Sequence, residues 1–283
     1  MKPFSILITL ISLLFLGSCS NKSIYISKWQ SPQLKVGEFN KHWDAPLQYD
    51  TKAQMLYGIS NDSQNLYVSL QVSDKSLQRK ILITGLSFWL DTTGKGKQQL
   101  GLTFPVQKSA QMNNRKNRNQ KMNNQKRSKT EIRKFNEKYI NGLSEILTIG
   151  FDGETESRIS GNKNTKGINA ILSMDSLQIL YYEVQIPLEM IFGQPDSFLN
   201  DSTKYFSYAF ETGHLEMPSQ GSGGMKGSGG GRGQGGGGGR GGGGGQSGMN
   251  SDVKREMQQM SQASKIQVKK ASLSNTVDYS NSN

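Results

Sequence analysis

A strict alternation of apolar and polar residues is the feature that most constrains how this chain can fold. In the segment Leu66–Val72 every second residue is leucine or valine, so one face of an extended strand is aliphatic. Residues 54–60 form a second extended run, and Asn61–Asn65 between the two runs consists of residues that favour tight turns. Together these segments predict a β-hairpin with one face turned to a core.

Extended runs of the same kind recur along the chain. They lie at residues 86–91, 98–104, 145–151, 168–173, 177–186, 204–210 and 266–273. Only residues 129–141 have a spacing of apolar residues that suits a helix, and this signal is weak. Many strands joined by short connections predict an all-β fold, an antiparallel β-sandwich.

The net charge is confined to two segments. The 283 residues include 34 Lys and Arg against 22 Asp and Glu, which gives a formal charge of +12. Residues 107–134 hold ten basic residues and one acidic residue, and residues 217–283 hold eight and three. The remainder is mildly acidic. This distribution argues against a fold that binds nucleic acid through one extended basic surface, and no specific nucleic-acid partner is expected.

Both basic segments are also low in complexity. Residues 107–134 consist largely of Asn, Gln, Lys and Arg, and residues 218–250 contain most of the glycines of the chain. We expect both to be disordered loops inserted in one domain, because neither can bury enough apolar surface to order itself. Residues 263–275 then form either the last strand of the domain or part of a tail that begins after Pro218. We favour the last strand.

The first 18 residues have the pattern of a secretory signal peptide. Lys2 precedes an apolar run, Ile6–Leu16, that is too short to span a bilayer as a helix. The run leads into Leu16–Cys19 (LGSC), which resembles the lipobox of bacterial lipoproteins, where the cysteine is diacylated and begins the mature chain. The resemblance implies lipidation of Cys19, a tether at residues 19–33, and attachment to a membrane of a bacterial cell envelope. Whether the protein occupies the periplasmic or the surface face stays open.

Five short motifs follow one another along the body of the chain: Val36–Trp43, Ser60–Val68, Val72–Asp74, Ser87–Asp91 and Tyr182–Leu188. In this order they resemble the motifs of family-nine carbohydrate-binding modules and of the wider group of DOMON-like sandwiches. The resemblance implies a DOMON-like β-sandwich of the jelly-roll type over residues 34–275, interrupted by the loops 107–134 and 218–250, with a disordered tail at 276–283. Sugar-binding members of this group hold a saccharide between aromatic rings, sometimes with structural calcium.

The sequence departs from these modules where their stacking aromatic residues would lie. Residues 76–85, the expected loop before the motif Ser87–Asp91, contain no aromatic residue, and the glycine-rich segment replaces the loop that would carry the second one. The remaining ligand-binding candidates are Trp89 and Asp91. If the two neighbours of Trp89 face the core, Trp89 lies on the outer face beside Asp91; otherwise Trp89 is a core residue.

Asp62 and Asp74 are the candidate metal ligands, because both lie where strands end and carboxylates in such turns can bind calcium. Turn formation explains both residues adequately as well.

Other metal centres have little support in the sequence. The single cysteine excludes multi-cysteine metal sites, and the presence of only two histidines, His42 and His214, argues against a histidine-rich centre. Haem, which some DOMON domains bind, has no supporting spacing of Met and His. No cofactor other than structural calcium is expected.

The sequence contains no recognisable catalytic motif. It has neither a G-x-S-x-G nucleophile elbow nor an H-E-x-x-H zinc helix, and its only cysteine is assigned to lipidation. We therefore expect that the protein is not an enzyme. Two functions stay open. One is a ligand-binding envelope lipoprotein, with a saccharide or another envelope polymer as partner. The other is a structural or assembly lipoprotein whose flexible basic loops contact anionic envelope components.

Overall fold

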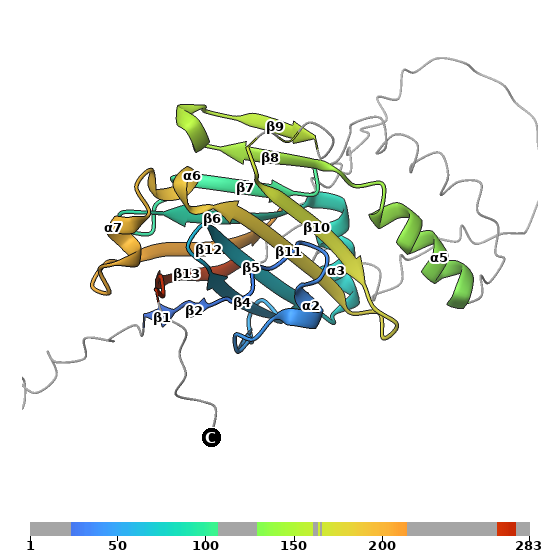
Figure 1. Ribbon diagram of the computed structural model, residues 1–283. Helices are drawn as coiled ribbons and strands as arrows, with labels where there is room; N and C mark the ends of the chain where they lie inside the picture. The colour runs from blue at the N-terminus through green and yellow to red at the C-terminus, as the bar shows by residue number, and fades with distance from the viewer. Residues whose placement is uncertain (1–23, 107–128, 161–163, 165, 214–264, 276–283) are drawn as a thin grey trace, which may run out of the picture.

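The computed structural model describes residues 24–106, 129–160, 164, 166–213 and 265–275. Within these residues the chain forms two β-sheets that pack face to face, with short helices at their margins (Figure 1). The fold is an all-β sandwich, which confirms the fold class that the alternation predicts.

The two sheets differ in size. In spatial order, the strands of the first sheet are β1 (Tyr25–Ile26), β13 (Lys265–Ser272), β12 (Phe206–Thr212), β6 (Leu86–Asp91), β7 (Leu100–Phe104), β8 (Glu145–Ile149) and β9 (Ser157–Ser160). Those of the second sheet are β10 (Asn169–Met174), β11 (Leu180–Pro187), β5 (Asn65–Val72), β4 (Met55–Asn61) and β2 (Lys28–Trp29), and β3 (Gln48–Asp50) also pairs with β4. Most neighbours are antiparallel, but β1 runs parallel to β13 and β2 runs parallel to β4. The expectation of a purely antiparallel sandwich is corrected at these two edges.

The core lies between the inner faces of the two sheets. Strand β5 contributes four aliphatic side chains, at every second position from Leu66, and each is fully buried. The first sheet contributes aromatic side chains to the same cluster, among them Phe88 and Phe210, whose ring centroids lie 5.0 Å apart. Burial of these side chains is the main source of stability for a fold of this kind.

The second sheet is also covered on its other face, which the alternation does not predict. Leu34, Phe39 and Tyr67 form a second buried cluster there, around the short helix α2 (Phe39–His42). The buried carboxylate of Glu183 on β11 holds this covering segment in place. Its Oε2 atom accepts hydrogen bonds from the backbone N–H groups of Gly37, at 2.5 Å, and Phe39, at 3.3 Å.

Residues 24–33, which the sequence predicts to be part of a tether, belong to the sandwich. Strands β1 and β2 both lie in this range, and the backbone N–H of Ser27 between them donates to the carbonyl of Ser272 at 3.0 Å. The phenol of Tyr25 donates to the carbonyl of Ile59 at 3.1 Å, so this side chain reaches between the sheets. A tether can therefore extend over residues 19–23 at most, and these lie outside the described residues.

A helix replaces the loop that the sequence predicts at residues 76–85. Helix α3 (Lys75–Thr84) begins after Asp74, whose carboxylate accepts a hydrogen bond from the backbone N–H of Leu77 at 2.7 Å. An aspartate in this position is a strong helix-starting signal. Leu77 and Ile81 are both buried and lie one turn apart, so the helix packs on the core with one face. The other short helical segments are η2 (Phe151–Gly153), α6 (Leu188–Phe192) and α7 (Asp196–Leu199).

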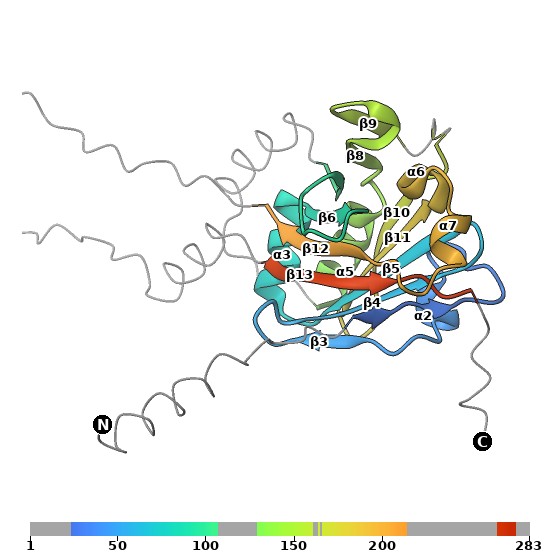
Figure 2. The same cartoon turned by 90° about the vertical axis from the view of Figure 1, so that its left-hand side faces the viewer.

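Strand β13 establishes that residues 265–272 are the last strand and not a tail. It lies between β12 and β1, and Figure 2 shows it beside β12. The domain therefore continues after the glycine-rich segment 218–250 and includes β13. That segment, the signal peptide, Cys19 and the tail 276–283 all lie outside the described residues.

The end of the basic segment 107–134 forms the first turns of helix α5 (Lys129–Ile140). Among the described residues, no helix has the length and apolar character needed to cross a bilayer.

Candidate ligand-binding site

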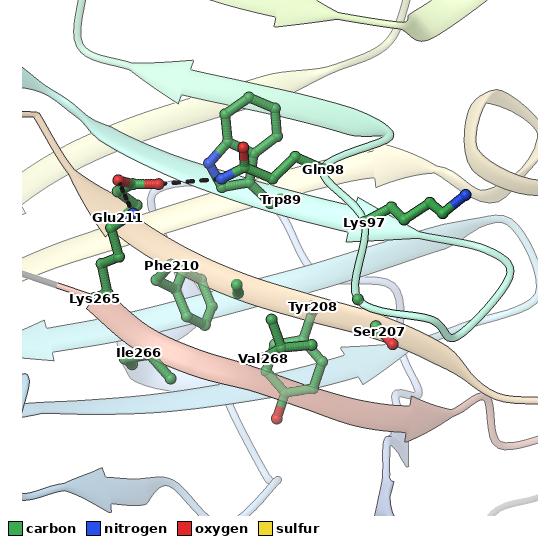
Figure 3. Close-up of a pocket in the computed structure, with 12 residues that line it drawn as sticks. Trp89, Lys97, Gln98, Ser207, Tyr208, Phe210, Glu211, Lys265, Ile266 and Val268 are labelled. Carbon is green, nitrogen blue, oxygen red and sulfur yellow. Dashed lines mark hydrogen bonds and ion pairs between the residues drawn. The ribbon is translucent and has the colours of Figure 1, made fainter.

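The outer face of the first sheet carries a hollow of about 560 Å³. Strands β6, β12 and β13 form its floor, and residues 96–98 of the loop between β6 and β7 form one wall (Figure 3). The side chains that matter most for its chemistry are Trp89, Gln98, Ser207, Glu211, Lys265 and Val268. Its volume lies within the range of pockets that hold small organic ligands.

Trp89 lies on the outer face of the sheet. Its neighbours Phe88 and Leu90 are each 1% exposed and belong to the core, whereas Trp89 is half-buried. Successive side chains of a strand point to opposite faces, so the indole is turned away from the core and toward the hollow. Of the two interpretations that the sequence leaves open, the structure supports the outer-face one.

Gly101 allows the indole of Trp89 to lie close to the sheet. The two residues are paired across β6 and β7. A Cβ atom at Gly101 would lie 2.8 Å from Cε3 of the indole, which is closer than van der Waals contact permits. The ring therefore lies over the backbone of β7, where only glycine leaves room for it.

A chain of polar side chains crosses the hollow. Gln98 donates from Nε2 to Oε2 of Glu211 at 3.2 Å, and Nζ of Lys265 lies 2.6 Å from Oε1 of the same carboxylate. Figure 3 shows this chain beside Trp89. An amide, a carboxylate and an ammonium group thus stand near one aromatic ring, and together they can donate hydrogen bonds to a polar ligand and accept hydrogen bonds from it.

Asp91 shapes the loop that forms the wall of the hollow. It is 1% exposed, and its Oδ1 accepts hydrogen bonds from the backbone N–H and the hydroxyl of Thr93, at 2.8 and 2.6 Å. Its Oδ2 accepts from the backbone N–H of Lys97 at 2.8 Å. Burial alone would raise the pKa of Asp91, but these hydrogen bonds outweigh it and lower the pKa below its ordinary value. The structure thus places this ligand-binding candidate beneath the loop, where it positions the residues that line the hollow.

Three buried polar atoms of the lining residues have no hydrogen-bond partner among the described residues. They are Nε1 of Trp89, Oγ of Ser207 and the phenol oxygen of Tyr208, a residue that also belongs to the core cluster. Ser207 is 1% exposed and is paired with Asp91 across β12 and β6, two positions along from the pair of Trp89 and Ala209. A buried donor or acceptor without a partner is unfavourable, so these atoms mark places where the packing around the hollow leaves hydrogen-bonding capacity unused.

The structure does not bring the two candidate metal ligands together. Asp62 and Asp74 lie at opposite ends of β5. Asp62 closes the turn before β5 by accepting from the backbone N–H groups of Gln64, at 2.7 Å, and Asn65, at 2.6 Å, and Asp74 starts helix α3. In the part of the chain that the structure describes, no three His, Cys, Asp or Glu side chains are grouped so that they could hold a metal ion.

A second hollow, of about 490 Å³, lies on the second sheet between residues 33–36 and strand β10. Its described lining residues include three amides, Gln33, Asn169 and Gln185, but no aromatic side chain. The first hollow is the better candidate, because it combines an aromatic surface with convergent polar groups.

Sequence reasoning identified Trp89 but missed the polar residues around it. Gln98 lies in a turn, and Glu211 and Lys265 lie on strands separated in the sequence by the glycine-rich segment. Alternation along β12 does place Glu211 on the face opposite the buried Phe210. The signal that was lacking is the pairing of β12 with both β6 and β13, which only the sheet order reveals.

Comparison with known proteins gives two similar solved structures. No protein-family model matches the chain, and no curated protein sequence matches it. One similar structure is a family-nine carbohydrate-binding module from Caldicellulosiruptor kristjanssonii in complex with cellotriose, at 11% identity and a TM-score of 0.28, covering 67% of this chain and 75% of the module. The other is described as a family-nine module from the same organism in complex with glucose, at 12% identity and a TM-score of 0.25, covering 67% and 76%. What this chain binds therefore has to be argued from its own side chains.

Proposed function

We propose that this chain is a non-catalytic lipoprotein of the bacterial cell envelope, anchored through Cys19, whose sandwich binds a saccharide in the hollow beside Trp89. The observation that carries the proposal is the indole of Trp89 lying against Gly101 within reach of the polar chain of Gln98, Glu211 and Lys265. The order of the sequence motifs, which resembles that of sugar-binding modules, points to the same ligand class.

The chemistry of a sugar ring suits this arrangement. One face of a pyranose is made of C–H groups, which pack against an aromatic ring, while its edge carries hydroxyl groups that both donate and accept hydrogen bonds. Trp89 provides the apolar surface, and Gln98 and Glu211 provide an amide and a carboxylate for the hydroxyl groups. Nε1 of Trp89 and Oγ of Ser207 lie buried beside this surface and have no hydrogen-bond partner among the described residues.

The lack of a second carboxylate supports binding without catalysis. Glycoside hydrolysis by the common route requires two carboxyl groups on either side of the scissile bond. Among the described residues that line the hollow, Glu211 is the only carboxylate, and it is engaged by Lys265. The hollow can thus hold a saccharide, while it offers no acid and base pair to cleave it.

The test is a titration of the chain from Ser20 onward with neutral and acidic oligosaccharides, followed by intrinsic tryptophan fluorescence, with and without calcium and at low and high salt. We expect saturable quenching by a neutral sugar that persists in high salt. Trp89→Ala should weaken binding by about tenfold or more in calorimetry, which does not depend on the lost fluorophore. Trp29→Phe is the matched control and should bind like the wild type.

The alternative function makes the opposite prediction. A structural or assembly lipoprotein would give no response to any neutral sugar and would bind only anionic polymers. That binding would disappear in high salt, because it rests on the release of counterions by lysine and arginine side chains. This result, with Trp89→Ala indistinguishable from the wild type, would replace the saccharide-binding proposal.

A further inference from the structure

Strand β1 and the residue before it expose two large apolar side chains at the edge of the first sheet. Ile24 is 46% exposed and Ile26 is 70% exposed, although both flank Tyr25, whose side chain points inward and bonds to Ile59. Because side chains alternate along an extended segment, Ile24 and Ile26 project to the same side, away from the core. The two isoleucines thus form a small apolar surface that an apolar partner can cover.

The position of these residues in the sequence points to their partner. Cys19 precedes Ile24 by five residues, and an extended chain spans at most about 3.3–3.6 Å per residue, or about 18 Å in all. A lipid-anchored Cys19 therefore holds β1 within that distance of the lipid attachment point. The two isoleucines are also flanked by Lys22 and Lys28, whose charges suit anionic lipid head groups.

We propose that the β1 edge of the sandwich, with Ile24 and Ile26, docks on a phospholipid bilayer that contains anionic lipids. This inference rests on the lipid anchor of the proposed function but not on its saccharide site. The lipid chains attach the protein, and the β1 edge then fixes which side of the sandwich faces the membrane, since isoleucine side chains enter the boundary between head groups and acyl chains.

The docked residues and the hollow lie toward different ends of the neighbouring strand. Ile26 is paired with Ser272 at the end of β13, whereas the hollow is lined by Lys265, Ile266 and Val268 of the same strand. Ser272 is four positions along the strand from Val268, which corresponds to about 13 Å. Docking of the β1 edge therefore does not require contact between the bilayer and the hollow.

The absence of any second cysteine makes a clean experiment available. The full lipidated chain is prepared as Ile26→Cys and, as a matched control, as Leu177→Cys, which replaces a 77% exposed leucine in the turn between β10 and β11. Each new thiol is labelled with a nitroxide. The protein is then reconstituted in vesicles of phosphatidylethanolamine and phosphatidylglycerol, and the access of the label to lipid-soluble oxygen and to a water-soluble relaxing agent is measured.

Docking predicts that the label at Ile26 is several-fold less accessible to the water-soluble agent than the label at Leu177, and more accessible to oxygen. Equal accessibility of the two labels would overturn the proposal. Mass spectrometry of the purified chain reports acylation of Cys19, and an unacylated Cys19 would overturn it as well, because the tether would be missing. Either result leaves the glycan titration untouched, so failure of docking is distinguishable from failure of saccharide binding.

Discussion

Trp89 lies over Gly101, the residue paired with it on the neighbouring strand, and this contact sets the position of the indole in the hollow. A methyl group at Gly101 must displace the ring. We therefore predict that Gly101→Ala weakens glycan binding by about tenfold and shifts the tryptophan emission, and that the unfolding free energy falls by about 1–3 kcal/mol. Gly142→Ala, where the nearest atom would lie 3.4 Å away, is the control and should leave binding unchanged. If Gly101→Ala bound the glycan with wild-type affinity, the position of the Trp89 indole would not determine binding.

Glu211 should matter for binding far more than for stability. Its ion pair with Lys265 is at the surface, since the two side chains are 24% and 59% exposed, and exposed pairs contribute about 0–1 kcal/mol. We predict that Glu211→Ala leaves the urea midpoint almost unchanged but lowers the affinity for the glycan several-fold, measured by calorimetry. Glu154→Ala, which removes the pair with Lys166 next to β9 at the far edge of the same sheet, should change neither quantity. An equal loss of affinity in both variants would contradict a specific role for Glu211.

The loop that forms the wall of the hollow depends on ionised Asp91. The hydrogen bonds from Thr93 and Lys97 outweigh burial and lower the folded-state pKa of this carboxyl below its ordinary value. A lowered pKa means that the contribution to stability is present above the unfolded-state pKa and is lost as the pH falls through the folded-state pKa. We predict that Asp91→Asn is less stable by about 1–3 kcal/mol at neutral pH, and that its difference from the wild type shrinks below about pH 4.

Urea unfolding of both proteins between neutral pH and pH 2 checks this expectation. The exposed Asp44→Asn is the control and should unfold like the wild type at neutral pH. If the difference between Asp91→Asn and the wild type stayed constant down to pH 2, hydrogen bonding to the charged carboxylate would not be the source of the loop's order.

The end of β12 and the start of β13 lie side by side, because Glu211 is paired with Lys265. A tight turn of about two to five residues can therefore join the two strands in place of residues 214–264. We predict that such a replacement keeps the sandwich folded, with a stability equal to the wild type or higher by about 1–2 kcal/mol through the shorter loop. In contrast, Ile266→Ala, at a side chain that is 1% exposed, should cost about 2–5 kcal/mol.

Thermal and urea unfolding distinguish these two variants. If Ile266→Ala unfolded like the wild type, β13 would contribute little to the core. If the shortened chain failed to fold, residues 214–264 would have a structural role that the pairing of β12 with β13 does not require.

The sequence predicts the strands whose two faces differ and misses the elements that depend on distant partners. The alternation that begins at Leu66 gives β5 almost to the residue, because one face meets a core and the other does not need aliphatic side chains. Strands β1 and β2 are two residues long, too short to show alternation, and they exist only because β13 and β4 offer edges to pair with. Asp74 was identified as a candidate metal ligand, whereas its backbone hydrogen bond makes it the start of helix α3.

Some residues of the candidate site can be predicted from the sequence, and others only from the order of the strands. Trp89 could be proposed from the sequence because an aromatic residue between two core positions of a strand must face outward once the register is known. Gly101, Glu211 and Lys265 gain their roles from the order of strands β7, β6, β12 and β13, and no local pattern encodes that order. Lipidation of Cys19 and the envelope location stay predictions of the sequence, since these residues lie outside the described part of the chain.

The placement of β13 between β12 and β1 has a consequence for how the protein is made. Among the described strands β1 is nearest the amino terminus, and its partner lies in residues 265–272, so the first sheet cannot be completed before those residues are synthesised. Contacts of such long sequence separation form slowly. For the proposed export through the signal peptide, this delay is an advantage, because β1 and β12 lack the strand between them until residues 265–272 have followed them out of the cytoplasm.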